Sequence, residues 1–393
     1  MDERANVDGV APAVPAKDSS QKKKRRVCVL TSVHSPLDIR IFHKECKALV
    51  QAGYGVSVVA EHEGDMVVEG VAIRAVPRST RRVWRMTGTA LRILWKALAE
   101  HADVYHFHDP ELIPVGLFLR VCGRKVIYDV HEDVPQDILD KGYLPLRWRR
   151  VLSWLATHIE PMAARYFSAI VSVTPHIAER FARVNSRVVR VSNFPRLEEM
   201  GAVNRIGWKE RGRSIAYVGQ ISANRGIAQM VEAVGLLSDS LDIRLKLAGR
   251  FSPARLLEDS STLPGWKQVD FMGVLERKST VELLGQVQAG LVIPHPHTQF
   301  PHAYPIKMFE YMAAGIPVIA SDFQIWREIV SSLRCGILVD PLNPKHIAEA
   351  IRFLVNDPAE AESMGRRGRA AVEELYNWGS EQQKLLSLYD SLL

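Results

Sequence analysis

Short apolar runs recur along the chain, and most of them are followed by a stretch with helical spacing. In the first half the runs occupy residues 27–30, 56–60, 104–108, 126–128, 170–173 and 188–191. In the second half they occupy residues 215–218, 245–248, 269–272, 291–293, 318–320 and 336–339. Apolar runs of this length predict buried strands of parallel sheets, with helices between them. The pattern therefore predicts doubly wound α/β domains, in which ligands bind at the carboxyl ends of the strands.

This rhythm restarts once, after a polar and charged stretch, which divides the chain. We expect a disordered basic tail over residues 1–25, a first domain over 26–195, a linker over 196–213 and a second domain over 214–375. The basic run that ends the tail is either solvated or an electrostatic tether to anionic lipid. A chain of 393 residues is long enough for two such domains.

Several helices can be placed between these runs. The expected helices cover residues 41–52, 227–237, 306–314, 344–355, 366–375 and 380–393, with a loop over 31–40. The helix at 306–314 is the best defined, because Pro305 precedes it and Gly315 ends it before the strand at 318–320.

The start of that helix has the features of an anion site. Its first backbone N–H groups are free and face the loop before it. Lys307 lies in the first turn, where the helix dipole disfavours a cation unless an anion is nearby. Glu310 lies one turn deeper, and its carboxylate can accept two ribose hydroxyls. The pattern suits a nucleotide, and the alternative is a surface helix with a weak pair between Lys307 and Glu310.

A glycine-flanked loop opens the second domain. Residues 219–226 follow the first strand of that domain and lead into a helix, and Arg225 can form forked hydrogen bonds to phosphate oxygens. Taken alone, the loop is either a phosphate cradle or only a turn. Together with Lys307 it predicts a two-cation clamp for a diphosphate, which would stabilise a departing diphosphate. The chain has no Asp-x-Asp motif to hold Mg²⁺.

The first domain carries dense polar loops at residues 106–111 and 129–133. His106 and His108 lie on one face of a strand, which is compatible with zinc, but the spacing fixes no third ligand. We therefore expect no metal.

Two stretches, 81–100 and 143–165, mix tryptophan with arginine at helical spacing. Basic amphipathic helices with tryptophan are typical of membrane-surface binding. Helices that pack on a core and carry solvated charges give the same pattern. No apolar run approaches the roughly 20 residues of a membrane span.

The net charge of +7 suits nucleic acid, membrane phosphates or an anionic substrate. No nucleic-acid-binding motif accompanies it, so we expect no nucleic acid. The four cysteines are scattered and the N-terminus lacks a secretory signal, which predicts a cytoplasmic protein. If the tryptophan- and arginine-rich stretches bind a membrane surface, the protein is peripheral on the inner face of the plasma membrane.

Residues 301–322 resemble the donor-site motif of retaining glycosyltransferases of the GT-B fold, family four. The family motif is Glu, seven residues, Glu, running into a helix and a Gly-x-Pro-Val strand. Glu310 matches the second Glu, and His302 stands where the first is usual. In the loop at 219–226, Gln220 and Arg225 stand for the Arg and Lys that bind pyrophosphate in the family.

The resemblance implies two Rossmann-like domains that face each other across a cleft, with a C-terminal helix at 376–393 that returns to the first domain. It implies His131 and Glu310 as catalytic residues, with His131 near the reacting sugar. The implied donor-site residues are Gly219, Gln220, Arg225, Gly226, His302, Tyr304, Pro305, Ile306, Lys307 and Glu310. Asp38, Arg40, His108 and Asp109 are expected on the acceptor side.

The function that it implies is retaining transfer of a sugar from a UDP- or GDP-sugar to a hydroxyl acceptor. The acceptor would be a glycan or a lipid-linked glycan, in cell-surface polysaccharide or glycolipid biosynthesis, with no metal or other cofactor. One alternative is a nucleotide-sugar hydrolase or epimerase on the same fold, which would act without an acceptor. The other is a non-catalytic membrane-associated scaffold, which the departures at Gln220 and His302 support.

Overall fold

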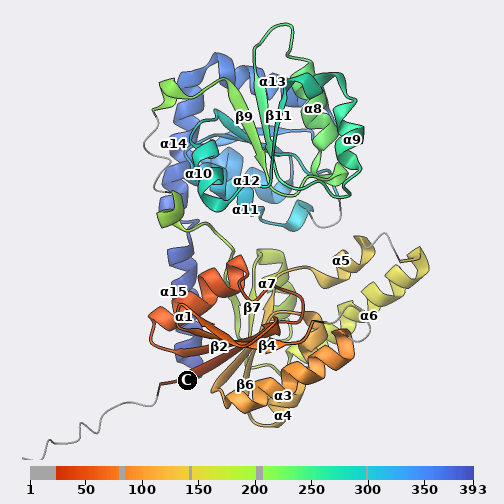
Figure 1. The fold of residues 1–393 in the computed structure, drawn as a ribbon, viewed down its shortest axis with the longest axis vertical. Coiled ribbons are helices and arrows are strands. Elements are labelled where there is room, and N and C mark those ends of the chain that lie inside the picture. The colour runs from red at the N-terminus through yellow and green to blue at the C-terminus, as the bar shows by residue number, and fades with distance from the viewer. Residues whose placement is uncertain (1–23, 79–84, 141–143, 201–206, 298–299) are drawn as a thin grey trace, which may run out of the picture.

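The computed structural model describes residues 24–78, 85–140, 144–200, 207–297 and 300–393. Most of the expected tail, the start of the first tryptophan- and arginine-rich stretch and part of the expected linker lie outside these ranges. The chain forms two lobes, each built on one sheet (Figure 1). The prediction of two parallel-sheet α/β domains is confirmed.

The N-terminal sheet has eight strands in the order β3-β4-β2-β1-β5-β6-β7-β8. They are β1 Arg26–Leu30, β2 Gly55–Glu61, β3 Met66–Val68, β4 Val71–Val76, β5 Val104–Phe107, β6 Lys125–Val130, β7 Ala169–Ser172 and β8 Val188–Arg190. The sequence did not predict β3 and β4, which form an antiparallel hairpin. Their turn uses Glu69 and Gly70, both at positive φ. β3 is only three residues long and mostly exposed, and Arg74 interrupts the apolar run of the buried β4, so the apolar pattern of the hairpin is weak.

Helices cover both faces of this sheet. One face carries η1 Ile39–Cys46, which is π-helical, α1 Lys47–Gln51 and α15 Trp378–Leu392. The other face carries η2 Arg85–Thr89, α3 Ala90–Glu100, η3 Pro110–Leu112, α4 Ile113–Val121, α6 Leu146–Ala164 and α7 Pro175–Ala182. α5 Val134–Asp140 packs on α6. The loop expected over 31–40 is shorter than predicted, because the Asp38 side chain accepts from the backbone N–H groups of Arg40 and Ile41 and starts η1 at Ile39.

The C-terminal sheet has six parallel strands in the order β11-β10-β9-β12-β13-β14. They are β9 Ser214–Val218, β10 Arg244–Ala248, β11 Val269–Gly273, β12 Ala289–Val292, β13 Val318–Ser321 and β14 Gly336–Val339. The helices and helical turns around it are η5 Trp208–Glu210, η6 Ala223–Arg225, α8 Ile227–Gly235, α9 Leu256–Ser261, η7 Pro264–Gln268, α10 Arg277–Leu284, η8 Phe300–His302, α11 Ile306–Ala313, α12 Gln324–Leu333, α13 Pro344–Asn356 and α14 Pro358–Glu374. α14 begins well before the expected residue 366, because Asp357 caps it through the N–H group of Glu360.

The chain crosses twice between the lobes, and the two crossings lie side by side. α14 packs on the C-terminal lobe, and α15 continues down beside the N-terminal lobe (Figure 1). The backbone N–H of Trp378 donates to the carbonyl of Pro195 on the other crossing, at 2.9 Å. No helix in the described ranges has the length and apolar character to cross a membrane.

The lobes meet through side chains that follow their strands. Asp140, at the end of α5, pairs with His297 at 3.1 Å. The ring of His176, in α7, stacks on the ring of His302 with centroids 4.9 Å apart. These contacts bring the carboxyl ends of both sheets together, where a doubly wound fold binds its ligands.

Candidate active site between the lobes

Lys307 lies buried under the loop that opens the C-terminal lobe. Its Nζ is 3.8 Å from the centroid of the Tyr217 ring, on β9. A Cβ atom on Gly219 would lie 3.1 Å from that Nζ, so the lysine fits because residue 219 is glycine. Burial, together with the charge of Arg225, lowers the pKa of Lys307 well below its ordinary value.

The loop at 219–226 takes its shape from its two glycines. Gly219 has a φ of 125° and Gly226 a φ of 77°, and a Cβ on Gly226 would clash with the carbonyl oxygen of Ile293. The Tyr217 hydroxyl donates to the carbonyl of Gln220 at 2.6 Å. These constraints present Arg225, in the η6 turn, on the same side as Lys307, with its guanidinium 5.5 Å from the centre of the Phe300 ring.

Two cations therefore converge beside the start of α11, whose first N–H groups are free of intrahelical partners. Like charges repel, and a helix N-terminus adds further positive potential. An anion bound between them would relieve this repulsion. The clamp for a diphosphate that the sequence predicts for this pair of residues stays a prediction.

Glu310 lies one turn along α11, and its side chain is largely buried. It pairs closely with Arg277 of α10, rather than with Lys307. Arg277 also donates to Glu199 at 2.9 Å. Sequence reasoning missed Arg277 and Glu199, because three separate segments supply this chain of charges and no local pattern links them.

The residues before α11 line the edge of the cleft. His302 is exposed and stacks on His176. Tyr304 packs edge-on against Phe309, with ring centroids 5.9 Å apart. Pro305 ends the loop in an extended conformation, and Ile306 begins the helix.

On the N-terminal side, His131 follows β6 and is mostly buried, with 16% of its side chain exposed. Its Nε2 lies 2.7 Å from Nδ1 of His108, and the two rings stack with centroids 4.9 Å apart. Burial lowers the pKa of His131 well below its ordinary value, so the ring is neutral at pH 7. The structure thus brings His131 and His108 together, with His108 behind His131.

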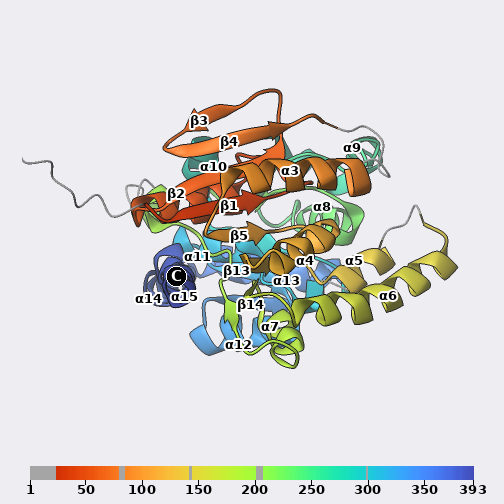
Figure 2. The same cartoon turned by 90° about the horizontal axis from the view of Figure 1, so that it is seen from below.

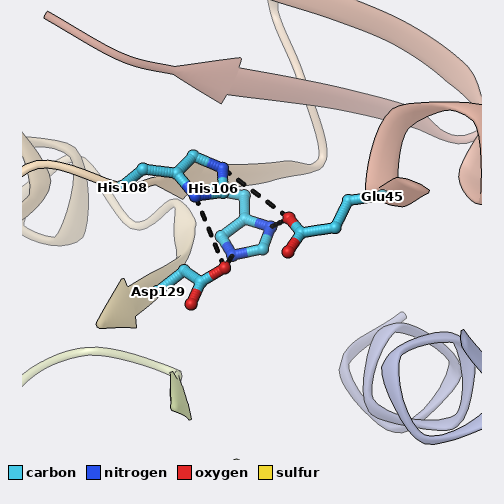
Figure 3. Close-up of side chains that lie close together, drawn as sticks. All are labelled: Glu45, His106, His108 and Asp129. Atoms are coloured by element: carbon cyan, nitrogen blue, oxygen red, sulfur yellow. Dashed lines mark ion pairs between the residues drawn. The ribbon is translucent and has the colours of Figure 1, made fainter. Parts of the chain in front are cut away.

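A buried group of four side chains supports this pair (Figure 3). The rings of His106 and His108, tilted by 30° with centroids 4.7 Å apart, lie between Glu45, on η1, and Asp129, on β6. His108 Nδ1 is 3.4 Å from Asp129 Oδ2, and His108 Nε2 is 3.7 Å from Glu45 Oε2. His106 Nδ1 hydrogen-bonds the hydroxyl of Tyr389, in α15, at 2.9 Å.

Arg40 balances the charge of this group. It donates to both oxygens of Asp129, at 2.9 and 3.1 Å, and its Nε is 2.9 Å from Glu45 Oε1. Burial raises the pKa of Asp129, but Arg40 together with His131 and His108 outweighs burial, so the pKa lies well below the ordinary value. Burial raises the pKa of Glu45 well above its ordinary value.

The same four side chains could hold a metal by their chemistry, since one donor atom from each lies within 4.8 Å of the others. Glu45 and Asp129 are the further ligands that the sequence could not supply. Arg40 occupies the carboxylates, however, and a divalent ion there would meet its guanidinium charge. We assign the group to the support of His131, and transfer without a metal stays a prediction.

The remaining residues expected on the acceptor side lie around this support. Asp38 caps η1, and Arg40 is buried in the charge group. Asp109 Oδ2 accepts from the hydroxyl of Thr31 at 2.7 Å and from the backbone N–H of Ser32 at 2.5 Å. These contacts place the three residues in the framework of the first loop, rather than with their charges free in the cleft.

His34 is a residue that sequence reasoning did not select. Its Nε2 is 3.4 Å from Asp109 Oδ1, and its ring lies 5.6 Å from that of His131. The ring is partly exposed beside the cleft. Nothing in the loop sequence marks this position, because its neighbour His131 is distant along the chain.

Comparison with known proteins agrees with this geometry. A family model for the glycosyl transferase 4-like domain matches residues 40–196, and one for glycosyl transferases group 1 matches residues 202–371. The two matches correspond to the two lobes. The chain is a group 1 glycosyltransferase of the GT-B fold.

This group 1 glycosyltransferase has curated relatives of similar length. It is 25% identical to the D-rhamnosyltransferase WbpZ of Pseudomonas aeruginosa over 74% of each chain. It is 22% identical to the phosphatidyl-myo-inositol mannosyltransferase of Mycolicibacterium smegmatis over 88% of each chain.

Solved structures share its fold. Sucrose-phosphate synthase of Thermosynechococcus elongatus superposes with a TM-score of 0.75 at 17% identity, covering 94% of this chain and 99% of that chain. HepE of Anabaena, solved with UDP and glucose, has a TM-score of 0.69 at 13% identity, covering 93% and 100%.

Proposed function

We propose that this glycosyltransferase transfers a sugar from a UDP- or GDP-sugar to a hydroxyl of a glycan or lipid-linked acceptor, with retention of anomeric configuration. The observation that carries the proposal is the convergence of Lys307 and Arg225 at the start of α11. Glu310 lies one turn deeper on the same helix. The three groups have the order of a diphosphate followed by a ribose.

The donor site stabilises the leaving group. When the bond between the sugar and the phosphate breaks, the electron pair stays on the diphosphate and negative charge grows there. In this proposal Lys307, Arg225 and the N–H groups of α11 meet that charge as groups that the fold already holds together, so they need little reorganisation in the transition state. Glu310 exchanges its partner Arg277 for the ribose hydroxyls when the donor binds.

Retention follows from attack on the face that the diphosphate leaves. The acceptor hydroxyl forms the new bond to the anomeric carbon, and its proton passes to the departing phosphate oxygen. No protein base is needed in this step. His131 is neutral and can therefore hydrogen-bond the sugar without placing a charge beside the positive anomeric carbon.

The relatives support a nucleotide-sugar donor. HepE of Anabaena was solved with UDP and with UDP-glucose. Two relatives are named for the transfer of rhamnose and of mannose. We propose a role of the same kind, in polysaccharide or glycolipid biosynthesis, and we propose that the clamp of Arg225 and Lys307 makes a divalent metal unnecessary.

The test is a titration of UDP, GDP and ADP into the protein, followed by assay with the matching sugar nucleotides. Ligand that binds only the folded state raises its melting temperature. We expect one of the three nucleotides to bind. Arg225→Ala should weaken the binding of both that nucleotide and inorganic pyrophosphate, whereas Glu310→Ala should weaken the binding of the nucleotide only. Arg366→Gln, on the exposed surface of α14, is the control and should bind as the parent does.

Product analysis completes the test. We expect the anomeric configuration of the donor in the product by NMR, in buffer containing EDTA. Absence of nucleotide binding in folded protein would overturn the proposal. Release of free sugar at the same rate with and without every acceptor would instead make the enzyme a hydrolase.

A further inference from the structure

Helix α6 carries a long apolar stripe that contacts no core. Its buried residues, Ser153, Glu160, Ala163 and Ala164, face the domain. The large apolar side chains on its exposed surface include Trp148, Val151, Leu152, Ile159 and Met162. These five recur at spacings of three, four and seven residues, so they form one stripe along the helix. Trp148 is 52% exposed and Met162 is 58% exposed, which is unusual for side chains of this size.

The neighbouring helices also expose large apolar side chains. α4 packs beside α6, and α3 packs beside α4. In Figure 2 the three helices lie on one side of the N-terminal lobe, and α6 reaches well beyond the sheet. α4 exposes Phe118 and Val121, and α3 exposes Trp95, which is 72% accessible. We call the exposed surface of α3, α4 and α6 the helical face. An apolar surface of this extent marks an interaction site.

The charges on this face are almost all positive. Arg147 and Arg150 are exposed in the first turns of α6, where the helix dipole disfavours cations. The only carboxylate of α6 is Glu160, which is buried and pairs with Arg180 at 2.8 Å. α4 contains no acidic residue. The partner of this face is therefore both apolar and negatively charged.

A basic pocket lies next to the far end of α6. It has a volume of about 550 Å³ and lies where β6 and β7 begin, away from the cleft. Arg120, Lys125, Arg165 and Arg187 line it, and no acidic side chain does among the described residues. Arg120 and Lys125 donate to backbone carbonyls, whereas the guanidinium groups of Arg165 and Arg187 form no ion pair within the described ranges. Two serines, Ser168 and Ser186, also line it, together with Asn185 and three apolar residues.

We propose that the helical face docks on an anionic phospholipid bilayer, with the stripe in the acyl–headgroup boundary and a lipid phosphate in the basic pocket. Tryptophan and leucine between arginines is the composition that binds such an interface. A second copy of the chain would set arginine against arginine, with no exposed carboxylate on α6 or α4 to pair with them. The proposal adds a location for the acceptor to the proposed function, but the docking does not require catalysis.

The experiment is co-sedimentation of the full chain with vesicles of phosphatidylglycerol and phosphatidylcholine, and with vesicles of phosphatidylcholine alone. We expect binding to the anionic vesicles only. Trp148→Ser with Leu152→Ser, and separately Arg165→Gln with Arg187→Gln, should each weaken binding about tenfold. All four positions lie on the surface, so melting temperature and nucleotide binding should stay at the parent values.

Two controls separate this proposal from others. Leu342→Ser with Phe353→Ser removes exposed apolar residues from the C-terminal lobe and should leave vesicle binding unchanged. Glu310→Ala should also bind vesicles as the parent does, whether or not the enzyme assay succeeds. The proposal would be overturned if all variants bound the vesicles equally, or if the parent bound neutral vesicles as well as anionic ones. It would also be overturned if the chain bound an acidic protein but not the vesicles.

Discussion

The ammonium group of Lys307 lies 3.8 Å from the centre of the Tyr217 ring, beneath the turn at Gly219. A ring face attracts a cation only weakly compared with a carboxylate or phosphate. The lysine is buried, and Arg225 pushes its pKa further down. A buried lysine in this position destabilises the free protein. We infer that the lysine is retained there because it binds an anion.

Replacing Lys307 by methionine should therefore lower the affinity for the diphosphate without lowering the free energy of unfolding. Lys307→Met keeps the length and apolar contacts of the side chain but removes the charge. We expect affinity for the diphosphate to fall by about 1.5–3 kcal/mol, the usual value of a hydrogen bond to a charged group. The free energy of unfolding should stay the same or rise, because a buried cation has been removed. Calorimetric titration and urea unfolding measure the two, and equal losses in both would contradict this account.

Gly226→Ala tests whether the shape of the loop at 219–226 depends on this glycine. The residue has a φ of 77°, and an added methyl group would meet the carbonyl of Ile293. We expect the free energy of unfolding to fall by about 2 kcal/mol or more, and nucleotide binding to weaken because Arg225 moves. Gly64→Ala is the matched control, since a Cβ there meets nothing within 4 Å. Similar melting temperatures for the two variants would show that the loop adapts.

Asp109 is expected to act through the loop that it holds. Its Oδ2 accepts from the hydroxyl and backbone of residues 31–33, and Asp109→Ala would leave these buried donors without an acceptor. We expect the free energy of unfolding to fall by about 2–4 kcal/mol in urea titrations. The exposed Asp239→Ala should change it by less than about 0.5 kcal/mol. A stable Asp109→Ala protein that has lost only acceptor binding would instead favour a direct contact with the acceptor.

Lys44 should make the free energy of unfolding depend on pH. This lysine donates to the carbonyl of Phe194 at 2.7 Å, and burial lowers its pKa to about 7 from an ordinary value of 10.5. Between these values the unfolded chain keeps a proton that the folded chain has lost, so stability rises with pH through this window.

The contribution is at most about 1.4 kcal/mol per pH unit. Lys44→Met lacks it, so the difference in unfolding free energy between parent and variant should grow in favour of the parent from about pH 7 upward. Urea unfolding at a series of pH values measures this, and parallel curves would show that Lys44 stays protonated in the folded state.

Features that are continuous in the sequence were the predictable ones. The glycines of the loop at 219–226, the start of α11 at Ile306 and the turn at Gly315 are set by local backbone preferences, so the sequence shows them directly. Strands such as β12 and β13 are buried on both faces, which makes them apolar along most of their length.

Features that join distant segments were not predictable in this way. Glu45 and Tyr389 reach His106 from opposite ends of the chain, and Arg277 reaches Glu310 from another helix. Their contacts arise only when the sheet topology is known. The same is true of the stripe on α6, because the amphipathic pattern does not say which of its apolar residues stay outside the core.

The position of α15 has a consequence for how the protein is made. Residues of this helix, among them Leu385 and Tyr389, fill the core of the N-terminal lobe, and Tyr389 bonds His106 at its centre. The ribosome must therefore synthesise the whole C-terminal lobe before the N-terminal lobe can close its core. The part of the enzyme that is translated first is completed last, and until then its sheet exposes the apolar surface that α15 covers in the finished protein, which makes it prone to aggregation.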